Sequence, residues 1–348
     1  YYFPHFLQLK DKTTGKVIRT IHNASFHNQA ASKVKRTANL KAVFMWPRGH
    51  AKSTHMDVFT PLWLMFQPLR LINFMVVVGK SEDAACRLLG DIQAELEYND
   101  RLKRDFGEQK PAGGDWTDGE FKANCGVKFL ACGRGQSPRG LRDREARPDY
   151  IVIDDLDDDE LCKNEKRVRE LTSWVKSALF GSLDVGRGRF IMVGNLISKN
   201  SVLYNIANTK GVFLSKVYAV DKNGEPTWKE KWTREEVDAY REFVGYRDWN
   251  KEMMHNPIID GSIFRHEWIK YKRMPKLTKY DALVCYTDPS WKSTTANDYK
   301  ACRLWGKLGS ELHLIDCFVR QATTGEMVRW QYNLYERAME QGASIQFY

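Results

Sequence analysis

Short apolar runs alternate with helical patterns along the first two thirds of the chain. The runs are nearly continuous, which is typical of strands that are buried on both faces of a parallel sheet. Beyond Ser81, a good N-terminal residue for a helix, apolar positions recur at helical spacing. The pattern predicts an α/β fold in which helices cover both faces of a parallel sheet. We expect a helix at about 52–66 and strands at Ala42–Trp46, Asn73–Val78, Gly126–Ala131, Tyr150–Ile153 and Arg189–Val193.

The last third of the chain has a different pattern. Residues 222–276 are rich in Trp, Glu, Lys and Arg and contain turn signals, so we interpret them as a lid and linker. A new set of strands begins at Asp281, followed by a helix at Thr324–Glu340 and a further strand that opens at Ala343. We therefore predict a first domain at 1–220, the lid and linker region at 221–276, and the N-terminal part of a second domain at 277–348. We expect both ends of the chain to be trimmed.

The turn after the first strand has the layout of a phosphate-binding loop. The apolar strand breaks at Pro47, and a helical pattern resumes after Lys52-Ser53. In such loops backbone N–H groups face an anion, the lysine lies near the outer phosphates and the hydroxyl can hold Mg²⁺. The match is incomplete, because Trp46 and Ala51 stand where glycines are expected, and an ordinary basic turn is the alternative. The predicted ATP-binding residues are Arg48, Gly49, His50, Ala51, Lys52, Ser53 and Thr54.

Polar residues follow two other buried strands. Asp154 and Asp155 end the strand that begins at Tyr150. In P-loop ATPases the first such carboxylate helps to hold Mg²⁺ and the adjacent acid activates the attacking water. The usual acid is Glu, so Asp155 is one methylene shorter. Asn195 ends another strand and is a candidate to hydrogen-bond the γ-phosphate or the attacking water, or else a simple turn residue. We interpret the acids at 157–160 as a solvated loop.

Two further segments are candidates for chemistry. The loop at 133–148 is rich in arginine, and one arginine would reach a neighbouring subunit's γ-phosphate while others meet DNA phosphates. The alternative is a surface loop with salt-bridged arginines. Asp288 follows a strand and Asp298 precedes the next, which resembles the start of a ribonuclease-H-like site where carboxylates converge on two metal ions. We interpret Asp316 as structural and expect further acids beyond Tyr348.

Composition narrows the classes of partner. The 348 residues carry a formal net charge of +10, which fits a polyanion such as nucleic acid, although an ordinary basic soluble protein is the alternative. The apolar segments are interrupted well before the ~20 residues that span a bilayer, so we expect no membrane role. Seven cysteines without a C-x-x-C pair fit a reduced cytosolic protein and argue against a disulfide scaffold or a zinc site.

The order of these motifs resembles the large subunit of terminase, the DNA-packaging motor of tailed bacteriophages. The resemblance covers nearly the whole chain, and its motifs occur in order at plausible spacing. The phosphate loop itself carries an arginine and lacks the second glycine, as terminase variants do. The segments that carry the resemblance are 47–53, 97–102, 106–107, 138–140, 147–157, 193–195, 255–257 and 287–289.

The resemblance implies a fold, an activity and partners. The fold would be a P-loop ASCE ATPase domain followed by a ribonuclease H-like (RNase H-like) nuclease domain, truncated here. The activity would be ATP-driven translocation of double-stranded DNA into a procapsid, with metal-dependent endonuclease cleavage of concatemeric DNA. The implied cofactors are ATP and Mg²⁺, with Mg²⁺ or Mn²⁺ for the nuclease. The implied partners are DNA, the portal protein of the procapsid, a small terminase subunit and like subunits in a ring, a pentamer on the portal. The protein would act in the host cytoplasm, dock transiently at the portal and be absent from the mature virion.

The resemblance also implies roles for single residues. Asp155 stands where the catalytic acid stands, and Arg139 is the first choice for the arginine that acts in trans, with Arg142 behind it. Ser53 and Asp154 would hold the ATPase metal, with Asn195 beside the phosphates. Asp288 and Asp298 would bind the nuclease metal, and Asp288 would be catalytic.

Two other functions remain open from the sequence. One is a helicase-like or repair ATPase that acts on DNA without packaging it, and the other is a scaffold that only binds DNA. The adenine contact is also open, with Tyr2, Phe3 and Gln29 as candidates. ATP turnover separates the two ATPase functions from the scaffold.

Overall fold

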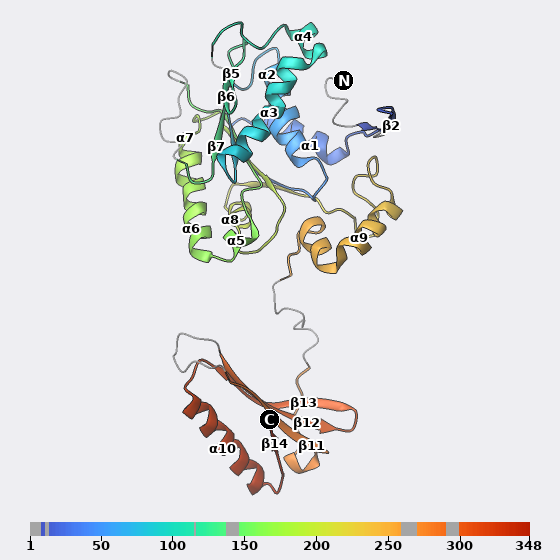
Figure 1. The fold of residues 1–348 in the computed structure, drawn as a ribbon, viewed down its shortest axis with the longest axis vertical. Coiled ribbons are helices and arrows are strands. Elements are labelled where there is room, and N and C mark those ends of the chain that lie inside the picture. Colours follow the sequence, from blue (N-terminus) through green and yellow to red (C-terminus); the bar gives the residue numbers. More distant parts are fainter. Residues whose placement is uncertain (1–7, 11–13, 115, 137–145, 259–269, 290–298) are drawn as a thin grey trace. The chain divides into compact units, whose positions relative to one another are not determined.

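The computed structural model describes residues 8–10, 14–114, 116–136, 146–258, 270–289 and 299–348. The chain divides into two compact units, unit 1 at Tyr1–Ser262 and unit 2 at Ile263–Tyr348 (Figure 1). The predicted domain boundaries at residues 220 and 276 fall on either side of this division and stay predictions.

Unit 1 is built on an eight-stranded sheet with the strand order β10-β3-β9-β8-β4-β7-β6-β5. The six strands from β10 to β7 are parallel, and the last two are antiparallel. The predicted parallel sheet is therefore confirmed, although β7 begins two residues later than expected and β10 was not predicted. The strands are β3 (Lys41–Met45), β4 (Phe74–Gly79), β5 (Trp116–Thr117), β6 (Glu120–Lys122), β7 (Lys128–Gly133), β8 (Tyr150–Asp154), β9 (Arg189–Gly194) and β10 (Phe213–Lys216).

Helices cover both faces of this sheet, as the continuous apolar strands predict. Along β4 every residue is buried, and alternate side chains enter opposite cores: Val77 packs into one, Val76 and Val78 into the other. Apolar side chains of four helical elements pack into the first core: α1 (Ser25–Arg36), η2 (Thr54–Phe59), α2 (Thr60–Met65) and α3 (Glu82–Tyr98). The second contains α5 (Asp159–Cys162), α6 (Glu165–Trp174), η3 (Val175–Leu179) and α8 (Val202–Ala207). The remaining elements are α4 (Asp100–Phe106), α7 (Phe180–Ser182) and the antiparallel pair β1 (Gln8–Lys10) and β2 (Val17–Thr20).

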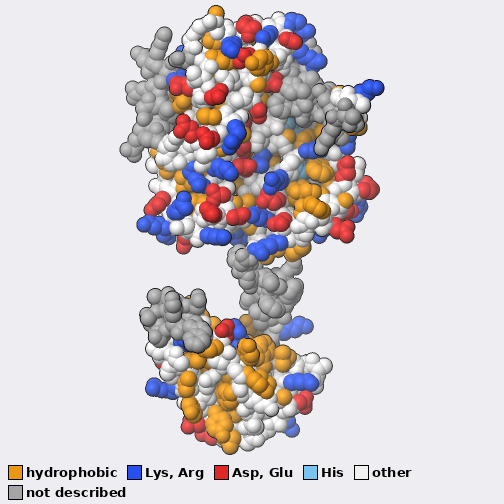
Figure 2. All heavy atoms as spheres, viewed as in Figure 1, with side chains coloured by type: hydrophobic (Ala, Val, Ile, Leu, Met, Phe, Trp, Pro, Cys, Tyr) orange, Lys and Arg blue, Asp and Glu red, His pale blue; other side chains and the backbone are white. Residues whose placement is uncertain are grey.

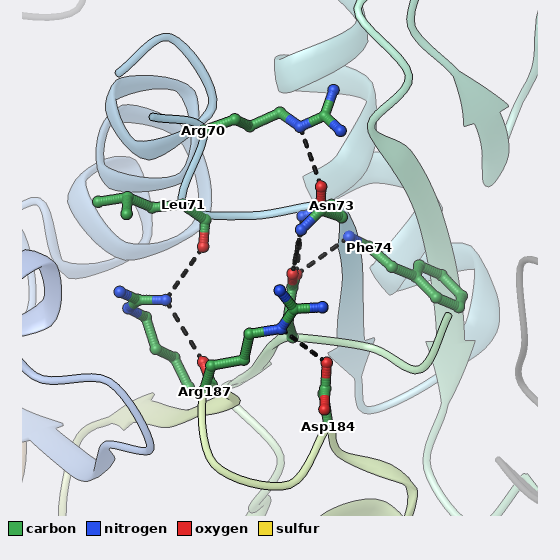
Figure 3. Close-up of polar contacts among 8 residues, drawn as sticks. Arg70, Leu71, Asn73, Phe74, Asp184 and Arg187 are labelled. Carbon is green, nitrogen blue, oxygen red and sulfur yellow. Dashed lines mark hydrogen bonds and ion pairs between the residues drawn. The ribbon is translucent and has the colours of Figure 1, made fainter. Parts of the chain in front are cut away.

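Buried charges fix the starting ends of the central strands (Figure 3). The Asp149 carboxylate accepts hydrogen bonds from the backbone N–H groups of Asn73 and Phe74, at 2.9 and 3.0 Å. Arg189 donates to the backbone oxygens of Leu71, at 3.1 Å, and of Val34, at 2.8 Å. These contacts tie the strands together at one edge. The carboxyl ends of the parallel strands therefore gather at the opposite edge, where ligands bind in open α/β sheets.

The segment after the sheet is also part of unit 1, and it begins the predicted lid and linker region. It contains α9 (Arg234–Asp248), with a break at Gly245, and a short π-helix η4 (Trp249–Met253). A small core of Ala219, Val237, Trp249 and Met253 holds this segment together. The Trp228 Nε1 group donates to the His22 backbone oxygen at 2.8 Å. The segment is thereby tied both to the residues after the last sheet strand and to the residues before α1.

Unit 2 is a four-stranded sheet with one long helix. Its strand order is β13-β12-β11-β14, with β14 parallel to β11 and the other pairs antiparallel. Apolar residues of α10, including Leu334 and Ala338, pack against Leu283, Cys285 and Leu304 of the sheet. Among the described residues of either unit, no helix is long and apolar enough to cross a membrane. The elements are η6 (Leu277–Lys279), β11 (Ala282–Asp288), β12 (Lys300–Leu308), β13 (Glu311–Arg320), α10 (Thr324–Glu340) and β14 (Gln346–Phe347).

Candidate functional site

The predicted phosphate loop joins β3 to a helix that begins at Lys52. The loop turns at Pro47, whose backbone oxygen accepts from the His50 N–H at 3.1 Å. Gly49 has φ +75° and Ala51 has φ +56°, both in the left-handed region. That region costs an L-residue ~1–2 kcal/mol and costs glycine almost nothing. Ala51 therefore adopts the backbone conformation that the missing glycine would supply.

The helix after the loop starts with an irregular turn. The Thr60 N–H bonds to the His55 oxygen, five residues back, so η2 is a π-helical stretch that α2 continues to Met65. The predicted helix at 52–66 is confirmed. Such one-turn π segments are often found at functional sites. Here the π-helical turn begins directly after Lys52 and Ser53.

Four of the predicted residues meet at the ends of the parallel strands, on the carboxyl side of the sheet. Asp154 ends β8 and is buried, while Asp155 has φ +41° and turns its side chain outward, where 62% of it is exposed. The Lys52 side chain reaches back from the loop, so that its Nζ lies 3.5 Å from the Asp155 Oδ1. Asn195, directly after β9, lines the same edge. The sheet order places β9 next to β3 and β8 next to β9, and so brings these residues to the loop.

A cavity of about 740 Å³ opens at this edge of the sheet. Its volume lies in the range of small-molecule and cofactor sites, ~300–1,000 Å³. Arg48, Lys52, Asp154, Asp155 and Asn195 line it. Lys80, Arg87, Lys251 and Glu252 also line the cavity. No sequence pattern singled out these four charged residues.

Burial dominates the electrostatics of Asp154. Burial and the neighbouring Asp155 raise the pKa of Asp154 to about 6, against the opposing effects of Lys52 and the Ser53 hydroxyl. Its Oδ1 is buried and has no hydrogen-bond partner among the described residues. A buried carboxylate oxygen without a donor is costly unless a cation or a proton compensates it. A hydroxyl and a carboxylate side by side fit a magnesium ion, which takes oxygen ligands.

Sequence reasoning missed Asp57, which is buried in η2 beside Asp154. Neither oxygen of its carboxyl group contacts a hydrogen-bond donor on the described residues. Burial first, and the Asp154 charge second, raise the pKa of Asp57 well above its usual range. Two neighbouring buried carboxyl groups disfavour each other's charge, so the raised pKa of Asp57 favours its protonated form. The only sequence feature that points to Asp57 is its position in the predicted helix, five residues after Lys52.

The Asn195 amide is held by a residue from the segment after the sheet. Its Nδ2 donates to the Glu252 Oε2 at 2.6 Å, and its Oδ1 is buried without a partner among the described residues. The Glu252 backbone oxygen accepts from the Arg48 N–H at 3.1 Å. Glu252 therefore contacts both the phosphate loop and the end of β9.

The acids after Asp155 are not a solvated loop, contrary to the interpretation from the sequence. The Asp157 carboxylate accepts from the backbone N–H groups of Val202 and Leu203, both at 2.8 Å, at the start of α8. Asp158 caps α5 and pairs with Arg134 at 3.0 Å, and Asp159 pairs with Lys251 at 2.7 Å. Asp159 and Glu160 are exposed, and the solvated description fits these two alone. The partners of Asp157, Asp158 and Asp159 lie far away in the chain, so composition alone does not reveal them.

The His50 side chain belongs to a buried ring cluster, and its Nδ1 lies 3.3 Å from the Arg48 backbone oxygen. The His27 Nδ1 accepts from the Ala24 N–H, and its Nε2 lies 3.0 Å from the His50 backbone oxygen. The His27 and His55 rings stack with centroids 4.2 Å apart. Burial lowers the pKa of His27, and that of His50, to about 4. These imidazoles are therefore neutral at pH 7.

Arg139, Arg142, Asp298, Tyr2 and Phe3 lie outside the described residues. Gln29 is exposed on α1.

In unit 2, Asp288 is exposed at the end of β11. Asp316 on β13 forms an ion pair with Arg337 of α10, which fits the structural role that the sequence suggested.

Among the described residues, no group of three or more His, Cys, Asp or Glu side chains is arranged to hold a metal ion. A metal at Ser53 and Asp154 would thus share its coordination with ligand and solvent oxygens.

Positive charge is not gathered in one place on the face of unit 1 seen in Figure 2. Lys and Arg side chains alternate there with Asp and Glu. The net charge of +10 still favours a polyanionic partner, but this face gives no position for it. DNA binding therefore stays a prediction from the sequence.

No family model matches the sequence, and no curated protein matches it. Solved structures to which the fold is similar include large terminases. One is the large terminase of a thermophilic bacteriophage, with 10% identity, a TM-score of 0.45 and coverage of 94% of this chain and 82% of that one. The complex of that phage's terminase with ATP-gamma-S has 10% identity, a TM-score of 0.41 and coverage of 90% and 74%. The large terminase ATPase domain of Thermus phage P74-26 has 14% identity, a TM-score of 0.43 and coverage of 66% and 92%. With these TM-scores below 0.5, any function must be supported by the chain's own residues.

Proposed function

We propose that this chain is the motor subunit of a bacteriophage DNA-packaging machine, of the large terminase type. It would hydrolyse ATP and use the energy to move double-stranded DNA into a procapsid. One observation carries the proposal: Lys52, Asp154, Asp155 and Asn195 come from three separate strand ends and line one cavity. In the ASCE class of P-loop ATPases, an added strand lies between the strand of the phosphate loop and the strand of the acidic pair. Strand β9 lies between β3 and β8 in this way.

In this proposal the loop binds the nucleotide phosphates. Backbone N–H groups of the loop would face the anion, apart from those of Arg48 and His50, which donate to backbone oxygens. The Lys52 ammonium group would lie near the outer phosphates, with Arg48 and Thr54 nearby. Ser53 and Asp154 would hold Mg²⁺, since Asp154 has a buried oxygen without a partner among the described residues. When bound, the metal would neutralise charge on the β- and γ-phosphates.

The water that attacks the γ-phosphate needs a base and an orienting group. Asp155 is the proposed base, since its side chain is exposed to the cavity beside Lys52. Asn195 is the proposed orienting group. Arg139 of a neighbouring subunit, with Arg142 behind it, is proposed to stabilise the charge that develops on the transferred phosphoryl group. This role of Arg139 requires that the subunits form a ring, proposed to be a pentamer on the portal. A small terminase subunit would bring DNA to this ring in the host cytoplasm.

Unit 2 is proposed to be the first part of an RNase H-like nuclease domain. Three antiparallel strands, a helix that packs on the sheet and a fourth strand parallel to β11 support this proposal. Asp288, at the end of β11, would bind Mg²⁺ or Mn²⁺ together with Asp298 and act in cleavage of concatemeric DNA. Cutting by a protein that includes the residues expected after Tyr348, and its loss in Asp288→Ala, would test this assignment.

A packaging assay tests the motor directly. Procapsids with portal, small terminase subunit, linear double-stranded DNA and ATP are incubated with this protein, and the DNA that becomes resistant to added nuclease is measured. The proposal predicts protected DNA of genome length with ATP and none with Lys52→Ala. Turnover of ATP without protection would favour a helicase-like or repair ATPase. DNA binding without turnover would favour a scaffold.

A further inference from the structure

Only one orientation of the Asn195 amide gives the Glu252 carboxylate a hydrogen-bond donor. The atom opposite it is a Glu252 carboxylate oxygen, 2.6 Å away, and an ionised carboxylate only accepts hydrogen bonds. The amide nitrogen must therefore face Glu252, and the amide oxygen must face away. That oxygen is buried and has no partner among the described residues. Glu252 thus fixes which end of the amide is paired and which end is left without a partner among the described residues.

Three hydrogen bonds hold the chain in place at and just after Glu252. Its backbone oxygen accepts from the Arg48 N–H at 3.1 Å, so η4 is fastened to the phosphate loop. The next residue, Met253, accepts from the Ala219 N–H at 3.0 Å through its backbone oxygen. The His255 Nδ1 accepts from the Leu196 N–H at 3.3 Å, one residue after Asn195. A side chain on such a supported backbone can orient another group reliably.

An amide oxygen that still lacks a donor suits one of the two candidate partners of Asn195 and not the other. Phosphate oxygens accept hydrogen bonds, so they would repel an amide oxygen, whereas a water molecule can donate to it. The Lys52 ammonium group, which lines the same cavity, pairs with Asp155 at 3.5 Å and not with the Asn195 oxygen. Asn195 is therefore arranged to hold the attacking water and not the γ-phosphate.

We propose that Glu252 is a positioning residue, which binds the Asn195 amide nitrogen and thereby directs the amide oxygen to the water that attacks the γ-phosphate. The inference rests on the proposed ATPase function and adds a residue from the segment after the sheet. It also gives η4 a part in catalysis, because any displacement of η4 from the phosphate loop would release the amide.

The test separates turnover from nucleotide binding. Phosphate release is measured for the purified chain, and affinity is measured by fluorescence titration with a fluorescent ATP analogue, mant-ATP. Glu252→Ala should lower kcat about tenfold or more, since the water loses its orientation, and leave the mant-ATP Kd within about threefold. Glu252→Gln keeps an acceptor for Nδ2 and should retain kcat within about threefold of the parent. Glu242→Gln removes an exposed charge from α9 and should behave as the parent does.

A double-mutant cycle shows whether the two residues act as a unit. Asn195→Ala should lose as much kcat as Glu252→Ala, and the double variant should lose no more than either alone. The inference is overturned if Glu252→Ala keeps the parent kcat, if it loses mant-ATP binding, or if the two losses multiply. A parent turnover that Lys52→Ala leaves unchanged would instead overturn the proposed function, and this inference with it.

Discussion

The Lys52 Nζ lies 3.5 Å from the Asp155 Oδ1, so the lysine of the phosphate loop and the acid at the end of β8 are paired across the cavity. Lys52 is almost fully buried, whereas most of the Asp155 side chain is exposed. An incoming triphosphate would compete with Asp155 for the ammonium group. Binding of the nucleotide would then release the carboxylate beside the γ-phosphate, where a base is needed.

Asp155→Asn tests whether this carboxylate acts as the base. The amide keeps the size of the side chain but cannot take a proton, so kcat should fall about 100-fold or more. The mant-ATP Kd should change by less than about threefold, because Lys52 and the loop remain. Glu160→Gln, an exposed acid in the same segment, is the matched control. Parent kcat in Asp155→Asn would require another base.

Asp157→Ala should affect stability and not turnover. Its carboxylate accepts from two backbone N–H groups at the start of α8, and loss of such a cap costs about 1–2 kcal/mol. Urea unfolding should show this loss, while Glu160→Ala should stay within about 0.5 kcal/mol of the parent. At temperatures where the variant is folded, kcat should equal that of the parent. A large loss of kcat at unchanged stability would instead make Asp157 part of the catalytic apparatus.

Ala51→Gly should stabilise the protein. Ala51 has φ +56°, which strains an L-residue, and glycine relieves the strain at some cost in the entropy of the unfolded chain. We expect the free energy of unfolding to rise by about 0.5–1 kcal/mol and kcat to be retained. Ala94→Gly, at an exposed position within α3, is the opposite control and should cost about 1 kcal/mol. A destabilised Ala51→Gly variant would show that the methyl group contributes more by packing than it costs in strain.

The buried histidines make unit 1 sensitive to acid. Burial lowers the pKa of His27 from 6.5 to about 4, so between these values the unfolded chain binds a proton that the folded chain excludes. The stability from neutral His27 is present above pH 6.5 and is lost as the pH falls toward 4, in total about 3 kcal/mol.

His27→Gln removes this titration while it offers an acceptor to the Ala24 N–H and a donor to the His50 backbone oxygen. Urea unfolding at pH 7 and pH 4.5 should therefore show a smaller acid-dependent loss in the variant than in the parent. Equal losses in the two proteins would mean that His27 titrates at its ordinary pKa.

The sequence was most informative about the parts of the site that are local. Continuous apolar runs such as Phe74–Gly79 predict strands that are buried on both faces, and polar residues directly after them, such as Asp154, predict the edge at which ligands bind. The layout of a phosphate loop was recognisable from Lys52-Ser53 although two expected glycines are missing, and Ala51 adopts the left-handed backbone conformation that suits one of them.

The parts that were missed depend on contacts between distant segments. Glu252 reaches Asn195 only because η4 folds back onto the phosphate loop, and nothing in the spacing of residues 249–253 indicates this. Asp57 is visible only as a buried carboxyl beside Asp154. Asp157 was taken for a solvated acid because its partners, the first N–H groups of α8, lie in a later segment. Pairing across the fold, and not residue type, determined these roles.

Phosphate release from ATP by the parent and by Lys52→Ala shows whether the cavity at the carboxyl edge is an ATPase site, on which the proposed motor and the role of Glu252 depend. Lys166→Ala, which removes an exposed lysine of α6, is the control for loss of a positive charge. An ATPase site predicts Mg²⁺-dependent release by the parent and the control, and a loss of about 100-fold or more in Lys52→Ala, because the outer phosphates lose their cation. Undiminished release by Lys52→Ala would refute the ATPase site.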